Sequence, residues 1–177
     1  AKKICLLKKV PVNLEISTNN KIIDIALKIK PDFICIVPEN RNEITTEGGL
    51  NLKRNSSKIK KIISKLKKRK IRTSLFINPN VSDIKISKNL NADCVEIHTG
   101  RLSNLVKSGK NYQNELNKIK QCSKTAANLG LEVHAGHGLD YKTTKILTKI
   151  NSIKEFNIGH FIIGESIFFG LKKVIKR

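Results

Sequence analysis

The stretch LEVHAGHG, residues 131–138, runs from an apolar strand pattern into a glycine turn that carries histidine. The stretch FNIGHFIIG, residues 156–164, has the same arrangement near the end of the chain. A nearly continuous apolar run is typical of a strand that is covered on both faces. The last strands of (β/α)8 barrels often end in phosphate-binding turns. Together the two stretches therefore favour a barrel over an open sheet.

Four earlier stretches are apolar in the same way, and all are read as strands: VNLEIS (12–17), DFICIVPE (32–39), RTSLFINP (72–79) and DCVEIHTG (93–100). Between them lie amphipathic helical patterns, one of which stops at Pro31 and another at Gly130. We expect helix N-caps at Thr18, Ser56 and Ser82. Strands that alternate with helices predict a parallel sheet with helical crossovers.

Such a sheet is either an open doubly wound sheet or a (β/α)8 TIM barrel. Polar residues fall at the ends of every strand pattern rather than at one switch point, and no G-x-G-x-x-G motif follows the first strand, so we expect the barrel. Six strand patterns are two fewer than a TIM barrel needs for closure. We therefore expect residues 1–177 to form a single, incomplete TIM-barrel domain whose first two β/α units are missing.

The composition bears on partners and location. A formal net charge of +21 would suit a nucleic-acid-binding module, which stays open as an alternative. Yet the lysines of residues 56–70 lie opposite an apolar stripe, as on a solvated helix face, and aromatic residues make up only 5% of the chain. No apolar run approaches the roughly 18 residues of a membrane span. We expect a cytoplasmic protein without a nucleic-acid or membrane partner.

The four cysteines are widely spaced and form no C-x-x-C pair. We expect them to be reduced and buried core residues: Cys5, Cys35, Cys94 and Cys122.

Every histidine of the chain lies at the end of a strand pattern or in the turn after it: His98, His134, His137 and His160. The carboxyl ends of barrel strands share one mouth, so these imidazoles are expected to converge on one pocket. A metal site built from His134, His137, His160 and Glu96 is an alternative. Barrel metallohydrolases, however, usually carry an H-x-H on an early strand, and none is visible here. We therefore favour acid–base chemistry.

Two carboxylates lie inside apolar strand patterns, Glu15 in VNLEIS and Glu96 in DCVEIHTG. Burial would raise the pKa of each towards the range of a general base. The structural alternative is a buried ion pair with a lysine. Glu96 and His98 are two residues apart and should project from the same face of one strand.

Glycine turns supply candidate anion sites. Thr45, in ITTEGGL, could donate a hydrogen bond to a phosphate or hydroxyl group, although the turn alone could explain its glycines. The turns of HAGHG and NIGH expose backbone N–H groups ahead of a helix, which is a stronger anion-binding arrangement.

Several blocks, in order along the chain, resemble one family: PVNLEIS, CIVPENRNEITTEGGLNL, SLFINP, VEIHTGR, ANLGLEVHAGHGLDY and FNIGHFIIGESIFFGLK. That family is the pyridoxine 5'-phosphate synthases of the deoxyxylulose-phosphate-dependent vitamin B6 pathway. The resemblance implies a (β/α)8 barrel that condenses 1-deoxy-D-xylulose 5-phosphate with 3-amino-2-oxopropyl phosphate. It also implies release of phosphate and water, no metal or organic cofactor, and assembly as a homo-oligomer, an octamer in the family.

The resemblance also implies roles for individual residues. Glu15 matches the general base, His137 the proton donor, and Glu96 the carboxylate that stabilises the transition state. Thr45 matches a contact to the deoxyxylulose phosphate. Gly138, Gly159 and His160 match the residues that hold the amino-ketone phosphate.

The family's first two strands carry further substrate-binding and catalytic residues that this sequence does not contain, so the fragment by itself is expected to be inactive. The alternatives are another phosphosugar isomerase or aldolase on a TIM barrel, and a basic nucleic-acid-binding module.

Overall fold

The computed structural model describes residues 1–7, 9–39 and 48–177. Its strands are β1 (Asn13–Ile16), β2 (Phe33–Ile36), β3 (Arg72–Ile77), β4 (Cys94–His98), β5 (Glu132–Gly136) and β6 (Ile153–Asn157). Its helices are α1 (Lys2–Leu7), α2 (Asn20–Ile29), α3 (Leu52–Lys68), α4 (Val81–Asn89), α5 (Gly100–Lys107), α6 (Gln113–Asn128), α7 (Tyr141–Leu147), α8 (His160–Phe169) and α9 (Leu171–Lys176).

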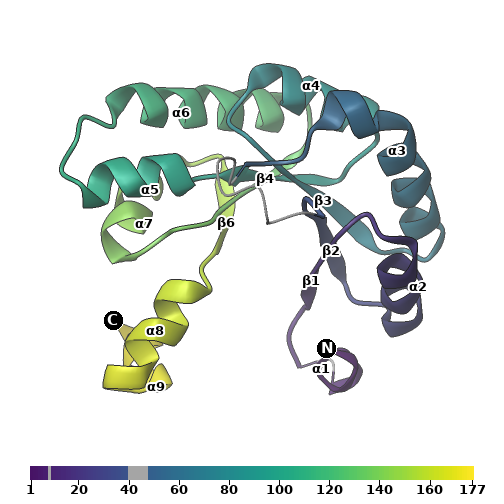
Figure 1. Cartoon of the computed structure of the whole chain (residues 1–177), viewed down its shortest axis with the longest axis horizontal. Helices are drawn as coiled ribbons and strands as arrows, with labels where there is room; N and C mark the ends of the chain where they lie inside the picture. Colours follow the sequence, from purple (N-terminus) through teal and green to yellow (C-terminus); the bar gives the residue numbers. More distant parts are fainter. Residues whose placement is uncertain (8, 40–47) are drawn as a thin grey trace.

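The strands form one parallel sheet in the order β1 to β6, so each strand pairs with its neighbours in the sequence. Figure 1 shows the sheet curving as a half-barrel, with α2, α3, α4 and α6 around its outside. The two edge strands, β1 and β6, lie on either side of the open part of this half-barrel. The expected incomplete TIM-barrel architecture is therefore confirmed, with six parallel strands.

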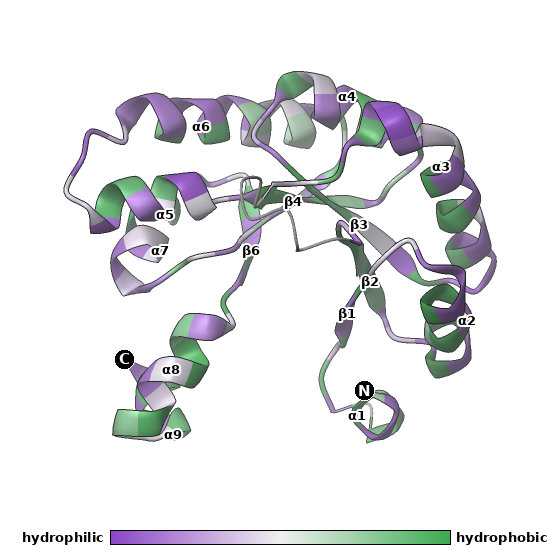
Figure 2. Ribbon diagram, viewed as in Figure 1, coloured by the Kyte–Doolittle hydropathy of each residue, from purple (hydrophilic) through white to green (hydrophobic). Residues whose placement is uncertain are grey.

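The hydrophobic core lies between the outer face of the sheet and the helices. In α3, Ile59, Ile62, Ile63 and Leu66 are buried, as the apolar stripe of residues 56–70 predicts. Hydrophilic and hydrophobic residues alternate along α3 and α6 in Figure 2, and the lysines of α3 are exposed apart from the half-buried Lys67. No helix within the described parts of the chain is long and apolar enough to span a membrane.

The helix N-caps differ from the expected ones. Asn19, Asn51 and Asn80 cap α2, α3 and α4, and each side chain accepts a hydrogen bond from a backbone N–H of the first turn. The predictions of Thr18, Ser56 and Ser82 were wrong because asparagine caps a helix as well as serine does, and asparagine is abundant in this chain.

The last strand also differs from its prediction. Strand β6 ends at Asn157, and residues 160–164 belong to α8, so His160 begins a helix instead of ending a strand. Helix α8 is mostly apolar but has no separate apolar face and no buried residue, with Ile167 and Phe168 largely exposed at 78% and 80%. An apolar run without periodicity does not distinguish a strand from a helix.

Candidate active site

The inner face of the sheet is polar, unlike the face that packs on the helices. Side chains alternate along a strand, so Val95 and Ile97 of β4 join the core while Glu96 and His98 point to the inside of the half-barrel. The expectation that Glu96 and His98 share one face is consistent with this alternation. Glu96 is only 3% exposed.

The Glu96 carboxylate has partners on two other strands. Its Oε2 atom accepts a hydrogen bond from the Asn157 amide of β6 at 2.8 Å and from the Cys35 thiol of β2 at 3.4 Å. Its Oε1 atom lies over Gly136 of β5, where an added Cβ would come within 2.0 Å of that oxygen. A side chain at position 136 is therefore incompatible with this position of the carboxylate.

Burial raises the pKa of Glu96 from 4.5 to about 7, because an ionised carboxylate is poorly solvated there. The hydrogen bond from Cys35 opposes the rise, the negative charge of Glu15 adds to it, and the bond from Asn157 again opposes it. Near neutral pH this carboxyl group can therefore both take up and release a proton.

All four cysteines are buried and free, as expected. Cys35, however, is more than core packing, because its thiol contacts Glu96. Burial, followed by the nearby Glu96 charge, raises the pKa of Cys35 well above its usual value of 9.0. The group is therefore a thiol that donates a hydrogen bond, not a nucleophilic thiolate.

Glu15 does not have the buried environment that the sequence predicts. It lies in register with Cys35 on the edge strand β1, and its side chain is exposed. Its charge still acts on Glu96 and Cys35, so it belongs to the same cluster. The alternative pair with a lysine is not among the ion pairs of the described residues. We call Glu15, Cys35, Glu96 and Asn157 the Glu96 cluster.

Two histidines meet at the carboxyl ends of β4 and β5. The rings of His98 and His137 lie 4.8 Å apart, and Phe76 packs edge-on against His98 at 5.2 Å. Gly100 leaves room for both imidazoles, because an added Cβ would come within 2.8 Å of His137 and 2.9 Å of His98. Two of the expected imidazoles are thus brought together at one strand-end site.

Thr99 fixes the turn that carries His137. Its hydroxyl lies 2.7 Å from the carbonyl oxygen of Gly136 and 2.9 Å from that of His137. The backbone of His137 has a φ of 79°, a left-handed conformation that costs free energy for a residue with a side chain. The contacts of Thr99 help to hold this conformation.

The expected phosphate-binding residues fall in different surroundings. Gly138 follows His137 with a φ of 74°, and its carbonyl oxygen accepts a hydrogen bond from Lys107 at 3.0 Å. Gly159 and His160 are exposed at the start of α8, outside the buried part of the site. Thr45 lies outside the described residues.

A cavity of about 620 Å³ borders the histidine pair, and His98 and Gly100 are part of its wall. Basic side chains also line it: Arg101, Lys110 and Lys118. Glu115 lines it as well and pairs with Arg101 and Lys118, so the lining keeps an excess of positive charge, which suits anionic molecules.

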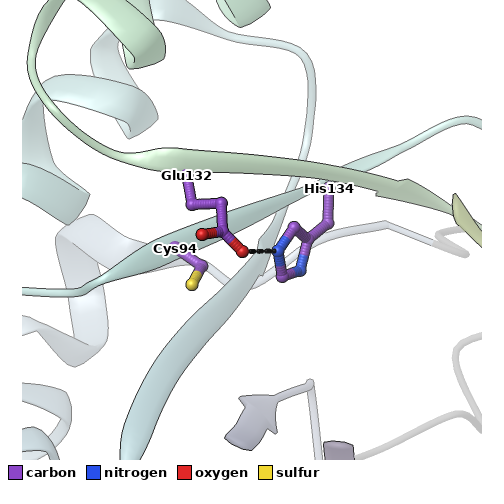
Figure 3. Close-up of side chains that lie close together, drawn as sticks. All are labelled: Cys94, Glu132 and His134. Atoms are coloured by element: carbon purple, nitrogen blue, oxygen red, sulfur yellow. Dashed lines mark hydrogen bonds and ion pairs between the residues drawn. The ribbon is translucent and has the colours of Figure 1, made fainter. Parts of the chain in front are cut away.

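His134 is separate from the histidine pair of His98 and His137 and has different partners. It is fully buried, and its Nε2 atom is 2.8 Å from Glu132 (Figure 3). Its Nδ1 atom is 3.6 Å from Glu155. Arg72 donates a hydrogen bond to the other oxygen of Glu132 at 2.9 Å. We call Arg72, Glu132, His134 and Glu155 the base network, because each lies within the first three residues of β3, β5 or β6, at the base of the half-barrel.

Within the described residues, one group has the composition of a metal site: Cys94, Glu132 and His134, whose ligand atoms lie within 4.8 Å of one another. Figure 3 shows the imidazole turned towards Glu132. The Arg72 guanidinium lies 3.5 Å from the Cys94 sulfur, and burial raises the pKa of Cys94 to about 12. Because the Cys94 thiol is protonated and the Arg72 guanidinium already supplies a positive charge there, the group is better described as an ion-pair network than as a metal site. The alternative ligand set with His137, His160 and Glu96 is not assembled among these residues.

Sequence patterns did not identify three residues of the site. Asn157, Cys35 and Gly136 contact Glu96 from other strands, and Asn157 and Cys35 are each 61 positions away from it. The position of Asn157 directly before the Ile158–His160 turn was the available signal.

Residues 1–177 match the model of a family described as pyridoxal phosphate biosynthesis protein PdxJ. The chain belongs to that family. A pyridoxine 5'-phosphate synthase of Pelagibacter ubique is 67% identical over 173 residues, which are 98% of this chain and 72% of that protein. The synthase of Campylobacter fetus is 43% identical over 197 aligned positions, which cover 99% of this chain and 76% of that protein. The resemblance of the sequence to the pyridoxine 5'-phosphate synthases is thereby confirmed, and the PdxJ family is one of biosynthetic enzymes.

Solved structures support the fold alone. The tryptophan synthase A-subunit of Pyrococcus furiosus superimposes with a TM-score of 0.63 at 14% identity, over 99% of this chain and 67% of that one. A xylose isomerase domain protein of Planctomyces limnophilus gives a TM-score of 0.54 at 13% identity, over 94% and 70%. This chain thus shares the barrel architecture of these proteins.

Proposed function

We propose that this chain carries part of the active site of a pyridoxine 5'-phosphate synthase. The reaction condenses 1-deoxy-D-xylulose 5-phosphate with 3-amino-2-oxopropyl phosphate to pyridoxine 5'-phosphate, phosphate and water. The main support is the buried Glu96 carboxyl group, whose pKa of about 7 suits reversible proton transfer, in a chain whose relatives are named as this synthase.

The Glu96 cluster and the histidine pair supply the groups that such a ring closure needs. Imine formation and dehydration require repeated proton transfers. In the proposal Glu15 is the general base, His137 is the proton donor, and Glu96 stabilises charge as it develops by taking up or releasing its own proton. Glu15 is exposed whereas Glu96 is buried, so the two carboxyl groups act from different environments within one cluster.

The two substrates are both phosphorylated, so the proposal requires two anion sites. Gly138, Gly159 and His160 would hold the phosphate of the amino ketone, and Thr45 would contact the deoxyxylulose phosphate. Support comes from the turn of Gly138, which lies against the Lys107 ammonium group. The proposal uses side chains and backbone alone, without a metal or organic cofactor, in a homo-oligomer.

The test is turnover of the two substrates by the complete gene product, followed as formation of pyridoxine 5'-phosphate. Glu15→Gln and His137→Asn should each lower kcat at least 100-fold, because each removes a proton-transfer group. Asparagine tolerates the positive φ of position 137, so this variant should keep its fold.

The matched control is Asp24→Asn on the exposed side of α2, which should leave turnover unchanged. Near-normal turnover in both site variants would remove the residue assignment. Turnover of a phosphosugar isomerase or aldolase substrate, with no pyridoxine 5'-phosphate formed, would replace the proposed reaction.

A further inference from the structure

The two oxygens of the Glu96 carboxylate have different surroundings. Among the described residues, both hydrogen bonds to this group go to Oε2, from Asn157 and from Cys35. Oε1 instead lies against Gly136, where an added Cβ would be only 2.0 Å away. An asymmetric set of donors makes one oxygen the favoured position of the negative charge.

Both partners of Oε2 act as donors to it. The Nδ2 atom of Asn157 is an amide donor, and Cys35 keeps its proton because it is buried beside a carboxylate. A proton on Oε2 would disrupt these two hydrogen bonds, whereas a proton on Oε1 leaves both in place, so the donors favour Oε1 as the oxygen that carries the hydrogen.

We propose that Asn157 and Cys35 are positioning residues that reserve Oε1 of Glu96 as the proton-exchanging oxygen, with Gly136 providing the space that this oxygen needs. The inference deepens the proposed function and rests on it for the catalytic consequence. The other charged or titratable groups that act on this carboxyl group are Glu15 from β1 and Glu155 from β6, with His134 beside it on β5.

The first test measures the pKa of Glu96 in the complete gene product by carboxyl ¹³C NMR, with Glu96→Gln to assign the signal. Asn157→Ala and Cys35→Ala each remove a donor to the charged form, so each should raise the pKa from about 7 to about 8. Cys35→Ser keeps a donor and should stay near the unsubstituted protein. Asn128→Ala, which removes an exposed amide from α6, and Cys122→Ala, which removes a buried thiol there, are the matched controls.

Kinetics separate positioning from mere structural support. Asn157→Ala should lower kcat about tenfold and leave KM within about twofold. The pKa read from the pH profile of kcat should rise together with the pKa of Glu96 measured by NMR. An unchanged Glu96 titration in both alanine variants would overturn the proposal. The NMR result holds even if the protein makes no pyridoxine 5'-phosphate, so failure of the proposed function is seen separately.

The second test locates the proton directly. A neutron crystal structure of the complete gene product at pD 5.5 should show deuterium on Oε1 of Glu96, with Oε2 facing the Asn157 amide and the Cys35 thiol. Deuterium on Oε2 would refute the assignment of the two oxygens.

Discussion

The Glu96 cluster and the base network lie on the same inner face of one sheet, yet they shift the pKa of a carboxyl group in opposite directions. In the base network, His134 and Arg72 donate to Glu132 and lower its pKa. In the Glu96 cluster, burial and the charge of Glu15 raise the pKa of Glu96. A carboxylate with a paired cation is structural here, whereas one with only neutral donors keeps an exchangeable proton.

The largest expected difference concerns activity. Glu96→Gln should lower kcat of the complete gene product at least 100-fold, because it removes both the charge and the exchangeable proton. Glu132→Gln should change kcat less than threefold, because Glu132 belongs to the base network. Steady-state kinetics on the two variants check this, and equal losses in both would abolish the functional contrast between the two groups.

The next contrast concerns the pH dependence of stability. Folding raises the pKa of Glu96 from 4.5 to about 7, so the folded state holds the proton more tightly than the unfolded state. The stabilisation of the folded state by this tighter proton binding is fully present below pH 4.5 and is lost as the pH rises through 7. A difference of about 2.5 between the two pKa values corresponds to about 3 kcal/mol at most.

Glu96→Gln should therefore be more stable than the unsubstituted protein at pH 8, by up to about 3 kcal/mol, and equally stable near pH 4.5. Urea unfolding at both pH values measures this. A variant that is less stable at pH 8 would mean that the ionised carboxylate is better solvated than its burial indicates.

A smaller effect is expected at His134. His134→Leu fills a similar volume but leaves Glu132 and Glu155 without the imidazole between them. We expect a loss of about 2 kcal/mol in the free energy of unfolding, with kcat changed less than threefold. Urea unfolding and steady-state kinetics check the two parts. A large loss of kcat with unchanged stability would place His134 in the catalytic site instead.

Local sequence patterns predicted what depends on one strand or one helix. Alternation along β4 predicted the shared face of Glu96 and His98, and the lysine spacing predicted the buried stripe of α3. The environment of Glu15 depends on whether β1 has a second neighbour, which its own residues do not specify. The contact of Asn157 with Glu96 depends on barrel curvature and on pairing across β5, so no local spacing contains it.

The smallest expected effect is that of the Arg72–Glu132 ion pair, which has the opposite pH dependence from Glu96. The side chains are 44% and 34% exposed, so solvent screens the pair, and Arg72→Gln should cost only about 0.5 kcal/mol at pH 7. Because the folded state lowers the pKa of Glu132, this contribution is present above the pKa of the unfolded state and is lost as the pH falls. The free energy of unfolding of Arg72→Gln, measured in urea, should therefore approach that of the unsubstituted protein in acid, where the stabilising charge of Glu132 is lost. Glu96→Gln also approaches it in acid, but there because the destabilising buried charge of Glu96 is lost. A cost of Arg72→Gln that stays the same as the pH falls would show that Arg72 stabilises the fold through its packing on Phe33, at 4.7 Å, and not through Glu132.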